Sequence, residues 1–210
     1  MNITDALNWR YAAKKFDTTR VIPDNTIEII KECFNLTASS YGLQPVKLLI
    51  VSNKSTLEAL VPISSNQQQV GQASHLCVFC VDTNIDEAYI RRYFENIKSI
   101  RNTPDHVLSS FRDSLISSFG SKSSLEKFNW GAKQAYLALG NMLTVCATQQ
   151  IDACPMEGFD PVAYDKYFNL MDKGLRSVLI MPIGYRSKDD VFASMKKVRK
   201  DINDSIIEIK

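Results

Sequence analysis

Two pairs of cationic side chains lie near opposite ends of the chain. Arg10 and Lys14 follow a short amphipathic segment at the N-terminus, and Lys197 and Arg199 lie close to the C-terminus. No acidic residue adjoins any of the four in sequence. Guanidinium and ammonium groups suit a phosphate, to which they donate charge-assisted hydrogen bonds. The pattern indicates one anionic ligand held by both ends of the chain, although most lysines and arginines are solvated surface charges.

The usual backbone motifs for binding phosphate are missing from the sequence. It contains neither G-x-G-x-x-G after a strand nor G-x-x-x-x-G-K-[ST]. A bound phosphate must therefore be held by side chains. No Ser-His-Asp or Cys-His arrangement stands out either, so we expect no catalytic side chain of that kind.

The five cysteines are an odd number, which argues against a disulfide framework and indicates a reducing compartment. Cys77 and Cys80 form a C-x-x-C motif within a short, apolar, β-rich run. Side chains three apart on a strand point to opposite faces of the sheet, so these two thiols cannot share a metal. We predict that both are core residues and that the chain has no metal site.

The composition predicts an ordinary folded protein with one domain over residues 1–210. Of the 210 residues, 45% are hydrophobic and 23% are charged. A net charge of +2 and a pI of about 8.2 give no broad basic surface, so nucleic acid is not an expected partner. The sequence shows no signal peptide and no run of the ~18 apolar residues that span a membrane. We expect a cytoplasmic protein without a membrane partner.

Apolar periodicity predicts helices alternating with a few strands. Asp24 is expected to cap a helix, and Ser55 to Glu58 matches a capping box. Other helices are expected at 87–100, 104–119, 125–149 and after Asp160-Pro161, and buried strands at 46–52, 75–81 and 175–183. These elements predict an α+β fold with a small central sheet and a long central helix.

The last residues, 205–210, resemble a strand with no partner in the chain. An exposed strand edge invites pairing with another molecule. The C-terminus is therefore a candidate contact between subunits.

Several segments match one known family in the same order along the chain. They are Trp9–Asp17, Ala38–Pro45, Asn66, Ala73–Cys80, Ala132–Leu137, Pro155–Gly158 and Met195–Lys200. Together they resemble the FMN-dependent NAD(P)H nitroreductases of bacteria, close to the oxygen-insensitive nitroreductase and dihydropteridine reductase branch. The resemblance implies a nitroreductase-like fold with a mixed or antiparallel sheet. It also implies an intertwined homodimer in which the tail, about 202–210, extends onto the partner subunit.

The resemblance implies FMN as the cofactor and gives its contacts. Arg10, Lys197 and Arg199 would surround the phosphate, and Ser39 and Ser40 would come from the partner subunit. The residues expected near the isoalloxazine ring are Lys14, Asn66, Pro155, Met156, Glu157 and Gly158. Lys14 and Glu157 would assist by electrostatics and positioning, while the chemistry itself belongs to the flavin.

At several of these positions the sequence departs from the family. Tyr11 and Ala12 stand where relatives carry histidine and serine, so a hydroxyl near the phosphate is lost. Gly42 replaces an asparagine, and Val46 replaces a tryptophan. Gln69 replaces a lysine near the flavin edge, which predicts weaker stabilisation of the anionic reduced flavin.

The implied activity is ping-pong hydride transfer from NADH or NADPH to flavin and on to small-molecule acceptors. These acceptors would be nitroaromatics, quinones or dihydropteridine-like compounds. Two alternatives stay open. One is another flavin reaction on the same fold, such as dehalogenation or flavin cleavage, and the other is a flavin-binding dimer without enzymatic activity.

Overall fold

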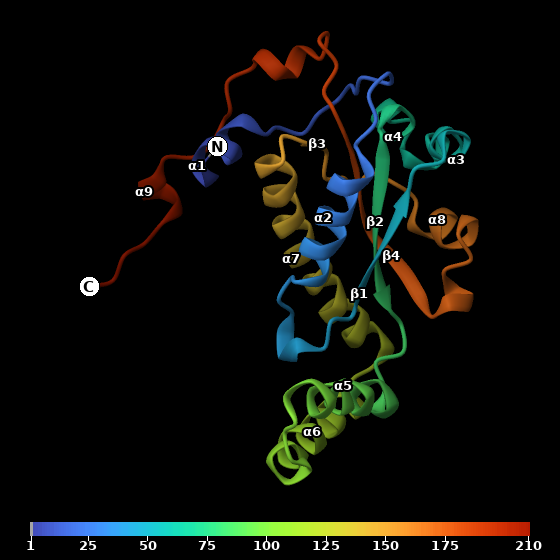
Figure 1. Cartoon of the computed structure of the whole chain (residues 1–210), viewed down its shortest axis with the longest axis vertical. Coiled ribbons are helices and arrows are strands. Elements are labelled where there is room, and N and C mark those ends of the chain that lie inside the picture. The colour runs from blue at the N-terminus through green and yellow to red at the C-terminus, as the bar shows by residue number, and fades with distance from the viewer. Residues whose placement is uncertain (1) are drawn as a thin grey trace.

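The computed structural model describes residues 2–210, and its centre is a four-stranded antiparallel sheet (Figure 1). The strand order is β1-β2-β4-β3. The strands are β1 (Val46–Val51), β2 (His75–Asp82), β3 (Asp152–Ala153) and β4 (Leu175–Gly184). The two central strands, β2 and β4, are almost entirely buried, as expected from their continuous apolar sequences. The expected α+β architecture is confirmed.

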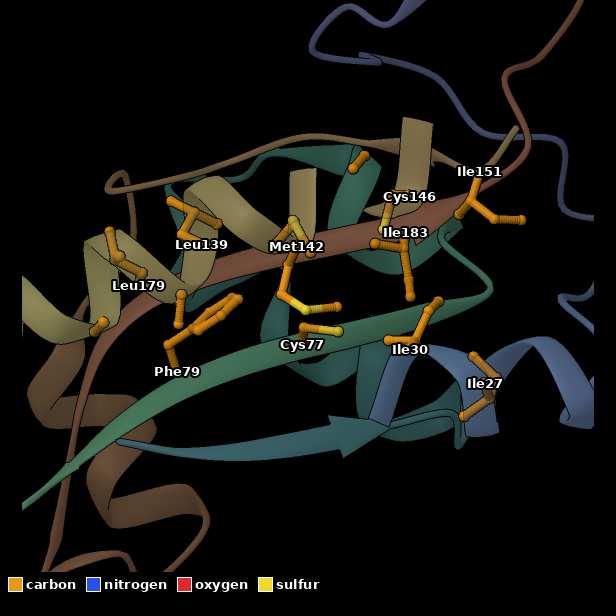
Figure 2. Packing of buried hydrophobic residues seen from close by; sticks show 14 of the residues in the cluster. Ile27, Ile30, Cys77, Phe79, Leu139, Met142, Cys146, Ile151, Leu179 and Ile183 are labelled. Carbon is orange, nitrogen blue, oxygen red and sulfur yellow. The ribbon is translucent and has the colours of Figure 1, made fainter. Parts of the chain in front are cut away.

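Helices cover both faces of this sheet. One face packs against α2 (Asp24–Asn35) and the long α7 (Ser124–Thr148), and Figure 2 shows α7 side chains meeting β2 and β4 there. The other face packs against α3 (Lys54–Leu60), α4 (Gln68–Gln72) and α8 (Pro161–Tyr167). A central sheet between helical layers follows from these contacts.

Cys77 and Cys80 show that side chains of β2 pack into the hydrophobic clusters on both faces of the sheet. Cys77 belongs to the hydrophobic cluster under α7, whereas Cys80 belongs to the cluster under α3 and α8. The two thiols therefore lie on opposite faces of the sheet, as predicted. Burial raises the pKa of the Cys80 thiol to about 12 and also raises that of Cys77.

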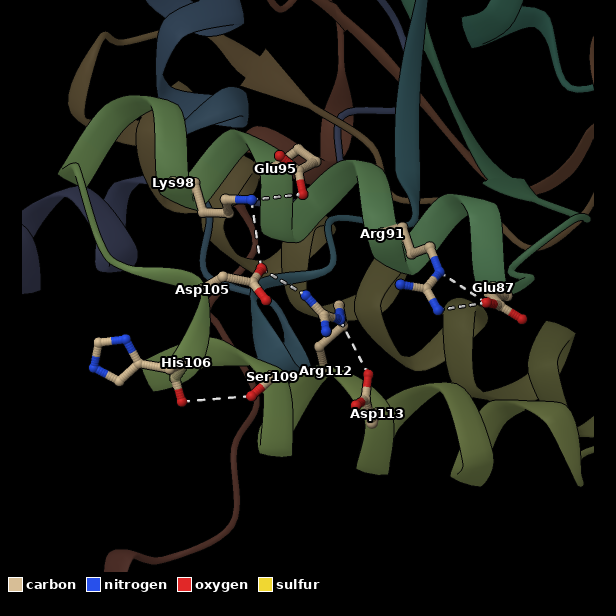
Figure 3. Close-up of polar contacts among 9 residues, drawn as sticks. All are labelled: Glu87, Arg91, Glu95, Lys98, Asp105, His106, Ser109, Arg112 and Asp113. Atoms are coloured by element: carbon tan, nitrogen blue, oxygen red, sulfur yellow. Dashed lines mark hydrogen bonds and ion pairs between the residues drawn. The ribbon is translucent and has the colours of Figure 1, made fainter.

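Two helices form a hairpin beyond one end of the sheet (Figure 1). They are α5 (Glu87–Arg101) and α6 (Asp105–Gly120), and their apolar sides share a cluster with Leu43 and Ile85. Asp105 accepts from Arg112 over 2.8 Å and lies 3.4 Å from the Lys98 Nζ, as Figure 3 shows. Such exposed ion pairs contribute little, so apolar packing holds the hairpin together.

The helix starts differ from three of the predictions. Pro104, expected as the first residue of its helix, is the N-cap of α6. The residue that caps α2 is Pro23, and Asp24 is instead the first helical residue. The capping box at Ser55 is wrong, because the Asn53 side chain accepts from the Thr56 amide and begins α3 earlier. The N-cap at Asp160 is confirmed, and α7 has a capping box formed by Ser123 and Glu126.

The strand predictions also need two corrections. β1 is only partly buried, because it lies at the edge of the sheet with a single neighbouring strand. Residues 206–210 form no strand, and the short α9 (Ile202–Ser205) precedes them. In Figure 1 this C-terminal segment extends away from the sheet and its helices. No helix within residues 2–210 is long and apolar enough to cross a membrane.

Candidate FMN site

A cleft of about 520 Å³ brings the two ends of the chain together. One wall is the end of α1 (Ile3–Trp9) with the segment after it, and the other is the short 3-10 helix η4 (Val191–Ser194) with the C-terminal segment after it. We call this feature the cationic cleft. Its lining residues are Asn8, Trp9, Arg10, Tyr11, Ala12, Lys14, Pro155, Phe192, Ala193, Met195, Lys196, Lys197, Val198 and Arg199.

All four cations singled out from the sequence line this cleft. Within residues 2–210, none of Arg10, Lys14, Lys197 and Arg199 forms an ion pair with a carboxylate. Burial and the Arg199 guanidinium lower the pKa of Arg10, and burial with Arg10 and Arg199 lowers the pKa of Lys197. Positive groups that oppose one another in this way would be stabilised by an anion. The chemistry of the cleft therefore suits a phosphate group.

A partly buried ion pair positions the N-terminal wall of the cleft. The Arg186 Nε donates to Asp152 Oδ1 over 2.7 Å. The Arg186 guanidinium carbon lies 4.1 Å from the centre of the Trp9 ring and 4.6 Å from the centre of the Tyr11 ring. The Arg186 backbone amide also donates to Asp152 Oδ2 over 2.8 Å. Arg186 thus joins the end of β4 to the residues on either side of Arg10.

Asp190 fixes the same wall from a second direction. Its Oδ2 accepts from the Lys14 amide over 2.8 Å, from the Lys15 amide over 3.1 Å and from the Tyr11 hydroxyl over 2.9 Å. Burial would raise the pKa of Asp190, but these donors outweigh it and hold the pKa below its usual range. The Tyr11 hydroxyl is consequently engaged by Asp190, and burial and that contact raise its pKa.

Beside Lys14 and Pro155 of the cleft lies a group of neutral side chains. Lys14 Nζ lies 3.7 Å from the Cys154 Sγ, and Gln69 Nε2 lies 3.8 Å from the Met156 Sδ. Gln69 also donates to Gln67 Oε1 over 2.8 Å, and Gln67 Nε2 donates to the Gly158 carbonyl over 3.0 Å. These contacts connect the cationic cleft to the Pro155–Gly158 segment.

Two consecutive amides in that segment are free to donate. Within residues 2–210, the Glu157 and Gly158 N–H groups have no hydrogen-bond acceptor, whereas the Met156 amide donates to the Ile180 carbonyl over 2.9 Å. A Cβ at Gly158 would lie 2.7 Å from Gln67 Nε2, so a side chain there would displace the Gln67 amide. A planar ligand with acceptor atoms on its edge could approach this backbone closely.

The remaining predicted site residues lie elsewhere in the protomer. Asn66 lines a separate cleft with Lys54 and Gln68, although it directly precedes Gln67. Ser39 lines a third cleft of about 220 Å³, where the neighbouring Ser40 amide donates to Gln134 Oε1 over 2.8 Å. One protomer therefore does not bring these residues into the cationic cleft.

Gly42 has a local structural reason for being glycine. Its φ angle is +72°, and a Cβ would lie 2.2 Å from the Tyr93 hydroxyl oxygen. Any larger side chain here would strain the backbone and displace Tyr93, which lies on α5.

Sequence reasoning missed several residues that shape the site. Gln67, Asp190 and Arg186 carried no motif, because their partners are distant in sequence. Lys196 adjoins Lys197, so the local basic run could have included it. Within residues 2–210, no group of three or more His, Cys, Asp or Glu side chains could hold a metal ion.

The fold and the cleft together define an α+β protein with a cationic ligand site joined to a backbone donor segment. The sequence model of the nitroreductase family matches residues 7–185. This chain therefore belongs to the nitroreductase family. The resemblance seen in the sequence is confirmed at the family level, while the branch within the family stays a prediction.

Similar proteins agree with this assignment. The chain is 28% identical over 217 residues to an oxygen-insensitive NAD(P)H nitroreductase of Salmonella typhimurium, and the match covers 100% of both chains. It is 33% identical over 202 residues to the Bacillus subtilis protein YfkO, assigned as an NAD(P)H nitroreductase, with 89% of this chain and 90% of that one covered.

Solved structures share the fold. A protein from Exiguobacterium sibiricum, assigned as a nitroreductase and crystallised in complex with FMN, has a TM-score of 0.85 at 18% identity, covering 100% of this chain and 98% of that one. A nitroreductase-like protein from Streptococcus mutans also has a TM-score of 0.85 at 22% identity, covering 99% and 98% of the two chains.

Proposed function

We propose that this protein is an FMN-dependent oxidoreductase that uses NADH or NADPH. The observation that carries the proposal is the joining of four cations without carboxylate partners to a segment with two free amides. Relatives whose names include NAD(P)H nitroreductase support the donor, and the FMN complex of a protein with the same fold supports the cofactor. Both parts of the site fit FMN, which has a phosphate at one end and a planar ring at the other.

In this proposal the site has two ends, which we name by their residues. The phosphate end consists of Arg10, Lys197 and Arg199, whose positive charges would bind the FMN phosphate. The ring end consists of Lys14, Gln69 and the Pro155–Gly158 segment. Here the amides of Glu157 and Gly158 would donate to the edge of the ring, and the Lys14 ammonium would favour its anionic reduced form.

The bound flavin would supply hydride transfer, accepting from the nicotinamide and reducing the second substrate in turn. The protein would contribute orientation and electrostatics. Within one protomer Lys14, Glu157 and Gly158 of the ring end are exposed to solvent. The second substrates we propose are nitroaromatics, quinones or dihydropteridine-like compounds, reduced in a ping-pong sequence in the same site.

We further propose a cytoplasmic homodimer in which the partner completes each site. Ser39 and Ser40 lie apart from the cationic cleft in the same protomer, so they would reach a flavin only from a second chain. The C-terminal end of the chain exposes several large apolar side chains among its charged residues, which favours contact with another subunit. Its exposed apolar residues are Val198, Ile202, Ile206, Ile207 and Ile209.

The test is a visible absorption spectrum of the purified protein after reconstitution with FMN and desalting. NADH or NADPH is added without oxygen, and a nitroaromatic or a quinone is then titrated in. The proposal expects the flavin absorbance to bleach with one or both nicotinamides and to recover with the acceptor. Retained flavin that no nicotinamide bleaches would instead indicate a flavin-binding dimer without reductase activity.

A further inference from the structure

Tyr136 makes a contact that core packing does not explain. It lies on α7, and its hydroxyl donates to the Glu157 Oε1 over 2.5 Å. The Tyr136 side chain is 47% exposed and belongs to none of the hydrophobic clusters in residues 2–210. The hydrophobic clusters between the sheet and its helices therefore do not include this side chain.

The acceptor of this bond is in the segment that carries the two free amides. Three contacts fasten that segment at successive residues. Met156 pairs with Ile180 of β4, the Gly158 carbonyl accepts from Gln67, and the Glu157 carboxylate accepts from Tyr136. The first two contacts hold the ends of the segment, and within residues 2–210 only the third restrains the Glu157 side chain between them.

We propose that Tyr136 is a positioning residue, which holds the Glu157 carboxylate and so fixes the direction in which the Glu157 and Gly158 amides point. This inference rests on the proposed function, because those amides need a flavin edge as their acceptor. Tyr136 acts through Glu157 and is not itself assigned to the reacting atoms. Without its hydroxyl, Glu157 would rotate freely and the amides would be less well ordered for binding.

The protonation of the pair agrees with this role. The hydrogen bond to Glu157, followed by burial, raises the pKa of Tyr136. The hydroxyl therefore stays protonated and able to donate throughout the neutral range. A tyrosine hydroxyl bound to a carboxylate is a charge-assisted pair, which holds geometry better than a neutral one.

The test is a cycle of Tyr136→Phe, Glu157→Ala and the double variant, with Tyr167→Phe as a matched control. Tyr167 is similarly exposed at 45%, and its hydroxyl has no hydrogen bond within residues 2–210. The flavin-free, full-length proteins are titrated with FMN, whose fluorescence is quenched on binding, and the absorption spectrum of the bound flavin is recorded. Circular dichroism melting checks that each variant is folded.

We expect Tyr136→Phe and Glu157→Ala each to weaken FMN binding about fivefold, the effect of one lost hydrogen bond. The double variant should bind no more weakly than the weaker single variant, because both changes remove the same contact. Tyr167→Phe should bind as the unaltered protein does.

Two results would overturn the inference while leaving the proposed function intact. The first is that Tyr136→Phe has the same FMN affinity and the same flavin spectrum as Tyr167→Phe. The second is that the losses of FMN binding free energy in the two single variants add up fully in the double variant. If the unaltered protein bound no FMN, the inference and the proposed function would fail together.

Discussion

Charged side chains form the phosphate end of the proposed site, whereas backbone amides and neutral side chains form most of the ring end. At the phosphate end, Arg10 and Lys197 have lowered pKa values because burial and other cations oppose their charge. At the ring end, the main donors are the free amides of Glu157 and Gly158, and the one cation, Lys14, lies against the Cys154 thiol. The two ends thus hold different parts of one ligand by different forces.

The phosphate end should therefore contribute mainly to FMN affinity, and the ring end mainly to the orientation of the flavin for hydride transfer. A cluster of cations supplies binding energy for an anion, but it gives little information on how a ring is oriented. Ordered amides contribute less charge and more direction, which is what hydride transfer requires. Changes at the phosphate end should therefore alter retention of FMN, and changes at the ring end should alter its reduction potential as well.

The largest expected effect is on stability and comes from the support of the phosphate end. Arg186→Met would leave the buried Asp152 carboxylate without its cationic partner, although the backbone amide of residue 186 still donates to it, and should lower the free energy of unfolding by about 3 kcal/mol. It would also release Trp9 and Tyr11 and weaken FMN binding. Lys15→Met, which removes the exposed pair with Asp189, is the control and should cost less than about 1 kcal/mol. Equal losses in the two variants, measured by denaturant unfolding, would contradict this role for Arg186.

A smaller effect is expected from removing one phosphate ligand. Arg199→Ala should weaken FMN binding about 30-fold, because a charge-assisted bond contributes about 2 kcal/mol. Lys200→Ala removes the same charge from an adjacent residue outside the cleft lining, and it should change the affinity little. Fluorescence titration measures both. Full FMN retention in Arg199→Ala would remove Arg199 from the phosphate end.

Gln69→Lys tests the ring end. Gln69 is 5% exposed and lies beside Met156 and Gln67, so a lysine there would place a cation near the flavin edge. That cation should stabilise the anionic reduced flavin and raise the midpoint potential by about 30 mV, or about 1.4 kcal/mol for two electrons. Redox titration against reference dyes measures the shift. An unchanged or lower potential would show that Gln69 does not govern it.

The smallest effect concerns acid stability. Asp190→Asn should lower the free energy of unfolding at neutral pH by about 1 kcal/mol through weaker hydrogen bonding to Tyr11 and the Lys14 amide. Since the folded-state pKa of Asp190 lies below the ordinary value of 3.8, its contribution is present above pH 3.8 and is lost as the pH falls below it. The difference in the free energy of unfolding between the variant and the unaltered protein should therefore become smaller in acid. A constant gap in unfolding measurements at successive pH values would contradict the assignment.

The sequence predicted the elements whose signals are local. The long α7 helix has apolar residues recurring along its length, and β2 and β4 are mostly apolar runs, so each was found within a few residues. The Asp24 and Ser55 caps failed because neighbouring residues, Pro23 and Asn53, occupy the cap positions. Several residues in a row could serve as a cap, and the pattern alone does not rank them.

The candidate site was predictable where side-chain type carries the function. Four cations without acidic neighbours suggested an anion site, and the fold brings them into one cleft. Asp190 and Tyr136 were not predictable, because each acts through a partner that is not close to it in sequence. Asp190 accepts from the Tyr11 hydroxyl, and the Tyr136 hydroxyl donates to Glu157. The amides of Glu157 and Gly158 are free because the folded chain places no acceptor near them, and no sequence pattern indicates this.

The measurement that tests the central claim most directly compares the dissociation constants of FMN and riboflavin, which differ only in the phosphate. If the cationic cleft holds the phosphate and the Glu157–Gly158 amides hold the ring, FMN should bind about 100-fold more tightly than riboflavin in the unaltered protein. In Arg199→Ala most of that difference should disappear while riboflavin binding stays the same. Equal affinities for FMN and riboflavin in the unaltered protein would contradict the division of the site into two ends.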